Sequence, residues 1–467
     1  MNMMRSTNWA VLLASTCAMS LLTGCAGLAP NGKPDLAQRF GETSVVPARD
    51  YWPNSTYPLA VGGNSNDWVS ISSIASSLWE REHTRSEGVL HIATSHDNSA
   101  TWSSLTPMFA DPVTTSDRDA FPLLANCSDG TWIALWLRWR YDPNDRPKMD
   151  VAQKLQAATL LTSSSRDRGE TWSAPRPIKL FPEERASWRF EPRDLATDST
   201  STLVCAGILW DSKSGSELEA GRVALAVSHD SGATWRLQRM MNNELWEMDP
   251  RVTTDGKGTW AVIWRSPINR IGDMEALLSV STDNAQTWSQ RPVLSRMPVH
   301  QVDIAFGRRG VLVALVLPLY KVNNNLKADG AAITRSTNLG STWDELHYLS
   351  MPRGAGQNDW IPSGPNPVPP DFGFYYTNLA SDGHGRIVAM WYSSQAPGGS
   401  GQGDSVATMS TDNGRTWSLT RYVNLDAPES QWGSTWPTIA YNGERTWVVQ
   451  WFSNGHEYYS LRSRAIR

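Results

Sequence analysis

Short apolar runs rich in β-branched residues recur along the chain, and polar turn segments separate them. Val223–Val227 and Ala276–Val280 are two such runs, and each leads into a Ser/Asp/Gly/Thr-rich turn. Other runs follow an Asp-Gly turn, as Trp132–Trp136 and Trp260–Trp264 do. Runs of this length between turn residues are typical of β-hairpins, so the pattern predicts an all-β chain.

One eight-residue motif, Ser-x-Asp-x-Gly-x-Thr-Trp, occurs six times and marks the chain as a repeat protein. The copies are Ser95–Trp102, Ser165–Trp172, Ser228–Trp235, Ser281–Trp288, Ser336–Trp343 and Ser410–Trp417. Their third position is Asp97, Asp167, Asp230, Asp283, Asn338 and Asp412. We interpret the motif as structural: the Asp accepts hydrogen bonds from the turn, and the Gly supplies a positive φ. The Trp is expected to cover the seam between neighbouring hairpins.

Three copies depart from the motif, with Ser99 and Ala285 in place of Gly and Asn338 in place of Asp. These turns are expected to form less tightly. Hairpin units that start near residues 57, 122, 193, 250, 302, 378 and 437 give seven repeats, the last of them without the motif. A spare strand pattern, Glu42–Val46, is expected to complete that last unit and so leave no open sheet edge. The strand pattern therefore predicts a single β-propeller of seven blades.

The motif resembles the Asp-box, or bacterial neuraminidase (BNR) repeat, and the chain after residue 40 resembles the sialidase-like β-propellers that carry it. The resemblance implies four-stranded blades with the Asp-box between the third and fourth strands. On its own it implies six blades, the alternative to the seven counted above. It also implies an active site around the central channel, on the face opposite the Asp-boxes.

The N-terminus has the pattern of an export signal. Arg5 precedes the apolar stretch Trp9–Leu22, which ends at Leu22-Thr-Gly-Cys25. This ending resembles a bacterial lipobox, so residues 1–25 are predicted to be a lipoprotein signal peptide with Cys25 as the lipidated residue. Residues 26–40 are expected to be a short tether and 41–467 the propeller. Ala26 favours outer-membrane sorting, with the lipid anchor as the only contact with the membrane.

Composition narrows the function classes. The net charge is −4 with no basic block, which argues against nucleic acid as a partner. No metal-binding motif is found, so neither a cofactor nor a metal is predicted. The protein is separately expected to be a monomer. Cys127 and Cys205 are left after signal removal, either as a disulfide or as two buried thiols.

Polar residues gather where the strands meet the presumed active face. Trp188–Arg193 and Trp246–Arg251 share the pattern Trp-x-x-acid-Pro-Arg, and Ser116–Asp119 holds the same place one unit earlier. Converging guanidinium groups suit the recognition of a carboxylate. Further residues on this rim are His300, Gln301, Asp303, Tyr375, Tyr376, Asn378 and Trp436, with Arg138, Arg140, Arg265 and Arg270 after second strands.

The resemblance assigns roles to this set. Arg118, Arg193 and Arg251 would hold a sugar carboxylate, and Tyr375 or Tyr376 would be the nucleophile. Glu191 or Asp249 would activate the Tyr, and Asp119 would be the acid/base. The first strand reads Tyr57-Pro-Leu-Ala60 where sialidases carry Phe/Tyr-Arg-Ile-Pro, a departure from the family pattern.

Each of these features also has a structural interpretation. The acid-Pro-Arg segments would be salt bridges between blades, and Tyr375–Tyr376 would pack in a loop. The Pro/Gly-rich segment 352–373 would be either a lid over the channel or a solvated insertion.

Three functions follow from the sequence. The first is an exported exo-glycosidase, a hydrolase of sialidase-like type, on an acidic or decorated glycan. The second is a propeller polysaccharide lyase on a uronate polymer, with His300 and Tyr375 as candidates. The third is a non-catalytic binding or assembly propeller.

Overall fold

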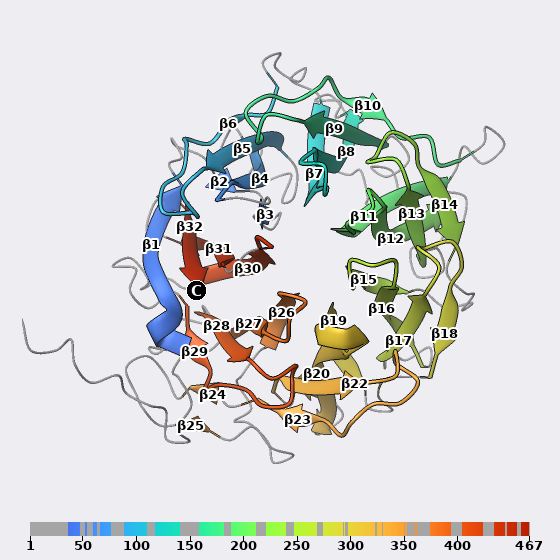
Figure 1. Cartoon of the computed structure of the whole chain (residues 1–467), viewed down its shortest axis with the longest axis vertical. Helices are drawn as coiled ribbons and strands as arrows, with labels where there is room; N and C mark the ends of the chain where they lie inside the picture. The colour runs from blue at the N-terminus through green and yellow to red at the C-terminus, as the bar shows by residue number, and fades with distance from the viewer. Residues whose placement is uncertain are drawn as a thin grey trace, which may run out of the picture.

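The computed structural model describes most of the chain from residue 36 to residue 466. The described residues are 36–46, 52–53, 59–62, 66–75, 88–109, 117–140, 158–181, 188–211, 221–239, 247–268, 274–292, 294, 298–322, 325–328, 330–349, 351–352, 360–361, 374–393, 404–423, 434–443, 446–454 and 459–466. Seven antiparallel sheets stand in a ring around a central axis, and the chain visits them in order (Figure 1). The fold is therefore an all-β, seven-bladed propeller. The strand count, and not the six blades implied by the resemblance, was the correct guide.

The sheets are numbered as blades I to VII in chain order. Blade I contains β2 (Trp52–Pro53), β3 (Leu59–Gly62), β4 (Trp68–Ala75), β5 (Val89–Ser95) and β6 (Thr106–Pro107). Blade II contains β7 (Asp117–Asn126), β8 (Trp132–Arg140), β9 (Thr159–Ser165) and β10 (Arg176–Pro177). Blade III contains β11 (Trp188–Thr197), β12 (Leu203–Asp211), β13 (Arg222–Ser228) and β14 (Arg236–Arg239). Blade IV contains β15 (Met248–Thr254), β16 (Trp260–Pro267), β17 (Met274–Ser281) and β18 (Ser289–Arg291).

The remaining blades follow the same plan. Blade V contains β19 (Val299–Phe306), β20 (Leu312–Val322), β21 (Asn325–Ala328), β22 (Ala332–Ser336) and β23 (His347–Tyr348). Blade VI contains β26 (Phe374–Ser381), β27 (Ile387–Ser393), β28 (Asp404–Ser410) and β29 (Arg421–Tyr422). Blade VII contains β30 (Ser434–Tyr441), β31 (Trp447–Asn454), β32 (Tyr459–Ile466) and β1 (Phe40–Val46). A separate pair, β24 (Met351–Pro352) and β25 (Trp360–Ile361), lies in the connection between blades V and VI.

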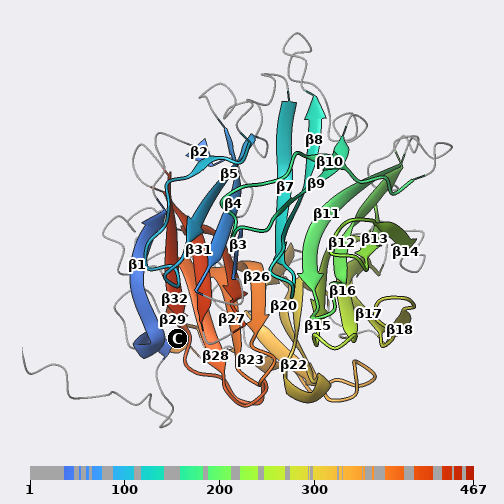
Figure 2. The ribbon, with the colours of Figure 1, turned by 45° about the horizontal axis from the view of Figure 1, so that its top comes forward.

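Strand β1 pairs antiparallel with β32, with Thr43 opposite Arg464 and Val46 opposite Leu461. Blade VII therefore combines strands from the two ends of the described chain (Figures 1 and 2). A 3₁₀ turn, η1 (Leu36–Arg39), precedes β1, and Leu36 is buried in the core beside blades VI and VII. The last residues of the expected tether, from 36 on, thus pack against the propeller. Cys25 and the segments 1–25 and 26–35 lie outside the described residues.

All six Asp-boxes lie between the third and fourth strands of blades I to VI, and their hydrogen bonds repeat. In blade II, Asp167 Oδ1 accepts from the Thr171 N–H at 3.0 Å and from the Ser165 hydroxyl at 2.8 Å. Its Oδ2 accepts from the Thr171 hydroxyl at 2.5 Å, and the Gly169 N–H donates to Ser165 Oγ at 3.0 Å. These donors favour the ionised carboxylate and lower the pKa of Asp167 to about 2.

The fifth motif position has a positive φ whether or not it is glycine. Gly169 has φ 86°, and a Cβ there would collide with Val69 of blade I. Ser99 and Ala285 hold φ 64° and 60°, and their N–H groups donate to the motif serine at 3.0 Å, as Gly169 does. The expectation that the turns with Ser99 and Ala285 form less tightly was therefore wrong, because their hydrogen bonds are as short as that of Gly169. Their departure from Gly shows as left-handed backbone, which is strained in a residue with a side chain.

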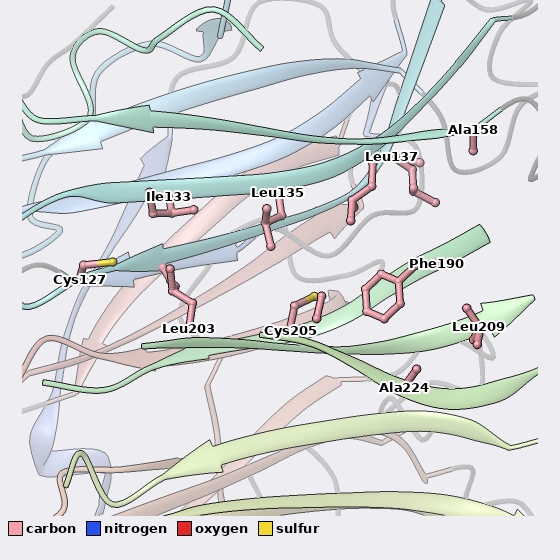
Figure 3. Packing of buried hydrophobic residues seen from close by; sticks show 14 residues of the cluster. Cys127, Ile133, Leu135, Leu137, Ala158, Phe190, Leu203, Cys205, Leu209 and Ala224 are labelled. Atoms are coloured by element: carbon pink, nitrogen blue, oxygen red, sulfur yellow. The ribbon is translucent and has the colours of Figure 1, made fainter. Parts of the chain in front are cut away.

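The hydrophobic core is divided among the spaces between neighbouring blades. Each Asp-box tryptophan packs against or within the cluster that its blade shares with the preceding blade, as Trp235 does with blade II and Trp417 with blade V. This confirms the predicted seam-covering role. Cys127 and Cys205 both belong to the cluster between blades II and III, where their side chains lie apart (Figure 3). They are two buried thiols, not a disulfide.

Within the described residues, no helix has both the length and the apolar character needed to cross a membrane.

Candidate functional site

A cavity of ≈ 330 Å³ occupies the central channel, and all seven blades contribute to its wall. Apolar residues such as Val61, Leu123 and Ile439 line one part of it. Charged and amide side chains from blades III to VI line the rest: Arg193, Asp194, Asp249, Arg251, Gln301, Asp303 and Asn378. The polar side of the channel is therefore concentrated on four neighbouring blades.

A β-bulge in each inner strand of blades II to VII sets which residues line this wall. The pairing register shifts immediately before Leu123, Asp194, Arg251, Gln301, Asn378 and Thr438. All six residues line the cavity. Phe121 (φ 51°) and Asp249 (φ 47°) hold left-handed backbone inside two of these bulges. Bulges re-aim side chains next to functional sites, and here they form a ring at one level of the channel.

The strongest charge cluster lies at blades III and IV. Asp249 forms an ion pair with Arg265 of the neighbouring strand β16. Burial by itself would raise the pKa of Asp249, but Arg265, Arg193 and Arg251 outweigh it and hold the pKa below its usual value. Asp249 is therefore an ionised carboxylate among three guanidinium groups. Arg193 also lies over the Phe121 ring of blade II, with its Cζ 5.2 Å from the ring centroid.

Two further carboxyl groups tie inner strands together across the channel wall. Asp194 Oδ2 accepts from the Val252 N–H of blade IV at 2.8 Å, and Asp303 Oδ2 accepts from the Leu379 N–H of blade VI at 2.9 Å. These N–H groups belong to edge strands, so the carboxylates satisfy donors that the sheets leave open. Burial raises the pKa of both, for Asp303 to about 7, while Arg251 acts against the rise.

Asp119 and Glu191, predicted as catalytic carboxylates, are buried and bonded mainly to residues of their own blades, although Asp119 also accepts from the Leu90 backbone of blade I. Asp119 is fully buried and accepts from Arg138 Nε at 2.6 Å, from Arg138 Nη2 at 2.8 Å and from the Trp136 indole at 2.9 Å. Burial raises the pKa of Asp119, and Arg138 acts against that rise. Glu191 pairs with Arg193 at 2.6 Å and accepts from the Trp210 indole at 2.7 Å. Neither carboxylate lines the cavity wall.

The ion pairs of the acid-Pro-Arg segments join residues of one blade. Arg193 pairs with Glu191 on β11, and Arg265 of β16 pairs with Asp249 of β15. The alternative of salt bridges between blades was thus wrong for the pairs that the structure describes. Between blades, Arg193 and Asp249 attract each other over a longer range, as do Arg251 and the carboxylates of Asp194 and Asp303.

The other predicted residues are placed less completely. Arg118 is buried in β7 and does not line the cavity. Tyr375 and Tyr376 lie in β26, where Tyr375 is the last paired residue before the register shift and Tyr376 is the first residue within it. Their side chains are outside the described residues. His300 lies near Asp249 and Arg265; burial lowers its pKa, Arg265 lowers it further, and Asp249 opposes both.

Glu247 is a buried carboxyl that was not among the predicted site residues, and neither was Asp194 of the cavity wall. Glu247 accepts from the Trp264 indole at 2.9 Å and from the Val223 N–H at 2.8 Å, and burial raises its pKa to about 7. With Asp119 and Glu191 it completes a set of three acids that each hold a second-strand tryptophan. The shared Trp-x-x-acid-Pro-Arg pattern concealed this, because it aligned Glu191 with Asp249 although their surroundings differ.

Metal binding has no support in the described part of the chain, where no group of three or more His, Cys, Asp or Glu side chains is arranged to hold an ion.

Comparison with known proteins places the chain by family and by fold. No curated protein sequence matches it. Among solved structures, a protein of unknown function from Dyadobacter fermentans has 14% identity over 92% of this chain and 99% of its own, with a TM-score of 0.51. The Hadza microbial sialidase Hz136 has 14% identity over 81% of this chain and 73% of its own, at a TM-score of 0.47. A mutant NanB sialidase from Streptococcus pneumoniae has 11% identity over 75% and 66%, at a TM-score of 0.46.

At such identities the first of these structures is similar in fold alone. The model of the BNR repeat-like domain family matches residues 90–389, which is more than half of the sequence and includes five of the six Asp-boxes. The chain belongs to the BNR repeat-like domain family.

Proposed function

We propose that the protein acts on an acidic glycan in the central channel, as an exo-glycosidase of sialidase-like type. The observation that carries this proposal is the cluster at blades III and IV, where Arg193 and Arg251 line the cavity beside the ionised Asp249. Guanidinium forks bind carboxylates through charge-assisted, often bidentate hydrogen bonds. The cavity of ≈ 330 Å³ is at the small end of ligand pockets, which suits one terminal sugar better than an internal chain segment.

In this proposal each polar residue of the cavity wall has its own role in binding or catalysis. Arg193 and Arg251 hold the sugar carboxylate. Asp249 stays ionised and stabilises positive charge that develops at the anomeric carbon. Asp303 has a pKa of about 7 on the same wall, which suits a proton donor near neutral pH. Tyr375 and Tyr376 remain the candidates for the nucleophile.

A second function, a lyase on a uronate polymer, is favoured by His300. Its lowered pKa keeps the imidazole neutral near pH 7, as a base that removes a proton next to a carboxylate must be. Arg265 lies close enough to affect that pKa, and a guanidinium group there would neutralise the uronate. The product distinguishes the two reactions, because a lyase leaves an unsaturated sugar end.

The experiment is product analysis of the purified protein on a panel of sialosides and uronate polysaccharides. Reducing ends and the absorbance of unsaturated ends are measured together for the wild type, Arg193→Ala and Arg251→Ala. Thr438→Val, which changes the blade VII side of the same cavity without changing charge, is the control. Free acidic sugar released by the wild type and by Thr438→Val, and lost in both arginine variants, supports the hydrolase. Unsaturated ends would replace it by the lyase, and no turnover on any substrate would favour a binding module.

The location of the protein is part of the same proposal. The signal at residues 1–25 and the lipobox Cys25 support an exported lipoprotein held at the bacterial envelope, with the outer membrane favoured by Ala26. Labelling cells with a radioactive fatty acid tests it, because a Cys25→Ser protein would lose the label.

A further inference from the structure

A basic hollow lies on the Asp-box face, at the opposite end of the inner strands from the charge cluster of blades III and IV. Its volume is ≈ 340 Å³, and it is lined by the β19–β20 and β26–β27 turns and by the Asp-box turns of blades V and VI. Four arginines contribute to its wall: Arg308, Arg309, Arg335 and Arg415. A second hollow of ≈ 680 Å³ shares Arg309, Thr337 and His384 with it. We refer to the four arginines and the first hollow as the Arg308 site.

The backbone of the Arg308 site is held in place by the neighbouring blade. The Arg308 N–H donates to Asn413 Oδ1 at 2.7 Å, and the Asn413 amide donates back to the Arg308 carbonyl at 3.1 Å. Gly307 makes room for this contact, because a Cβ there would collide with the Asn413 amide oxygen. Arg309 is fixed in left-handed backbone with φ 59°. Arg308 and Arg309 are thus presented from a turn of blade V that Asn413 of blade VI holds in place.

The positive charge of the site is only partly balanced. Arg335 pairs with Asp344 at 3.2 Å. Among the described residues of the wall, Asp412 is the single carboxylate, and its oxygens accept from Ser410 and Thr416 inside the Asp-box. Over the described residues, no ion pair joins Arg308, Arg309 or Arg415 to a carboxylate. This concentration of positive charge contrasts with the net charge of −4 of the whole chain.

We propose that the Arg308 site binds phosphoryl groups, with the exposed Arg308, Arg309 and Arg415 as ligands. Planar guanidinium forks on rigid backbone match phosphate oxygens, whereas a single sugar carboxylate would use one fork only. The phosphoryl groups come either from a free or glycan-borne phosphate or from the headgroups of an anionic lipid surface. The site is separate from the channel, so the proposal stands independently of the glycosidase.

Isothermal titration of the full chain with inorganic pyrophosphate tests the site. The wild type is expected to bind, and Arg308→Ala/Arg415→Ala to bind about a hundredfold more weakly, at about tenfold for each lost charge-assisted group. Arg166→Ala is the matched control, since Arg166 is also exposed, on the Asp-box of blade II; it is expected to bind as the wild type does. All three proteins should unfold at the same temperature.

Co-sedimentation with vesicles identifies the source of the phosphate. Binding to phosphatidylglycerol but not phosphatidylcholine vesicles, reduced in the double variant, would support lipid headgroups. Pyrophosphate binding without that difference would support a free or glycan-borne phosphate. The proposal is overturned if pyrophosphate and phosphatidylglycerol both fail to bind, or if the double variant and Arg166→Ala bind equally.

Discussion

Replacing Asp119 with asparagine separates a structural role from a catalytic one. The carboxylate is fully buried and accepts two hydrogen bonds from Arg138 and one from the Trp136 indole. Asparagine keeps the shape and one acceptor, so the indole contact survives. The Arg138 guanidinium, whose side chain is only 20% exposed, loses the carboxylate charge that faces it. We therefore expect Asp119→Asn to be strongly destabilised.

The magnitude follows from the burial of the pair. Removing one partner of a buried ion pair costs about 3–5 kcal/mol, whereas an exposed pair contributes about 0–1 kcal/mol. Asp344→Asn is the matched control, because Asp344 pairs with Arg335 but is 58% exposed. It should change the free energy of unfolding by less than about 1 kcal/mol. Asp119→Asn should remove a large part of the free energy of unfolding, which is about 5–15 kcal/mol for a typical domain.

Urea unfolding followed by tryptophan fluorescence measures both variants, and a double-mutant cycle isolates the pair. In Asp119→Asn/Arg138→Gln both charges of the pair are removed together, so the double variant should be more stable than the sum of the single effects predicts, by about 2 kcal/mol or more. If Asp119→Asn unfolds at the wild-type urea concentration, the buried pair does not stabilise the fold. Loss of turnover with unchanged stability would return Asp119 to the role of catalytic acid.

Three further predictions concern stability and thiol chemistry. Ser99→Gly should raise the free energy of unfolding by up to about 1 kcal/mol, because it relieves a left-handed φ of 64° and removes a buried hydroxyl without a partner; a less stable variant would contradict this. The hydrogen bond to Asp67 raises the pKa of His96 above 6.5. The His96–Asp67 pair therefore stabilises the fold below pH 6.5, and this stabilisation is lost as the pH rises through the folded-state pKa of His96. Stability of His96→Gln measured against pH should lack that loss, and an unchanged profile would count against it. Cys127 and Cys205 should react with a thiol reagent only after unfolding, since both are buried and burial raises the pKa of Cys127 to about 11; rapid labelling of the folded protein would disagree.

The fold was predictable because the Asp-box is a local motif. Its hydrogen bonds join residues no more than four apart, as Asp167 and Thr171 show, so the turn can be recognised from sequence spacing alone. Once the turns are placed, the strands between them and the number of blades follow. Each turn contains two consecutive residues with positive φ, such as Arg168 and Gly169, and only the second was anticipated, because glycine marks that position in most copies.

The site was predictable only in outline. Arg193, Asp249 and Arg251 were placed on the rim, and the structure brings them together. Their partners were not assigned, because Arg265 is 16 positions away from Asp249 and pairs with it through the neighbouring strand. The bulges also escape sequence reasoning, since each depends on the register of two strands.

Asp119 and Glu191 show the same limit for buried acids. Each is held by a tryptophan at a distance of 17 or 19 positions, and abundant tryptophan gives no signal of which indole faces which carboxylate. A pattern that suited catalysis therefore did not distinguish a channel-lining acid from one that fixes a strand pair.

The most direct measurement of the central claim is equilibrium binding of acidic and neutral sugars to the channel. Sialic acid, glucuronic acid and glucose are titrated against the wild type, Arg251→Ala, Arg251→Lys and Thr438→Val, with the unfolding temperature measured for each. We expect at least one carboxylated sugar to bind the wild type and Thr438→Val, and glucose to bind neither. Arg251→Ala should lose that binding, and Arg251→Lys should keep part of it. Equal binding of neutral and acidic sugars, or unchanged binding by Arg251→Ala, would contradict carboxylate recognition in the channel.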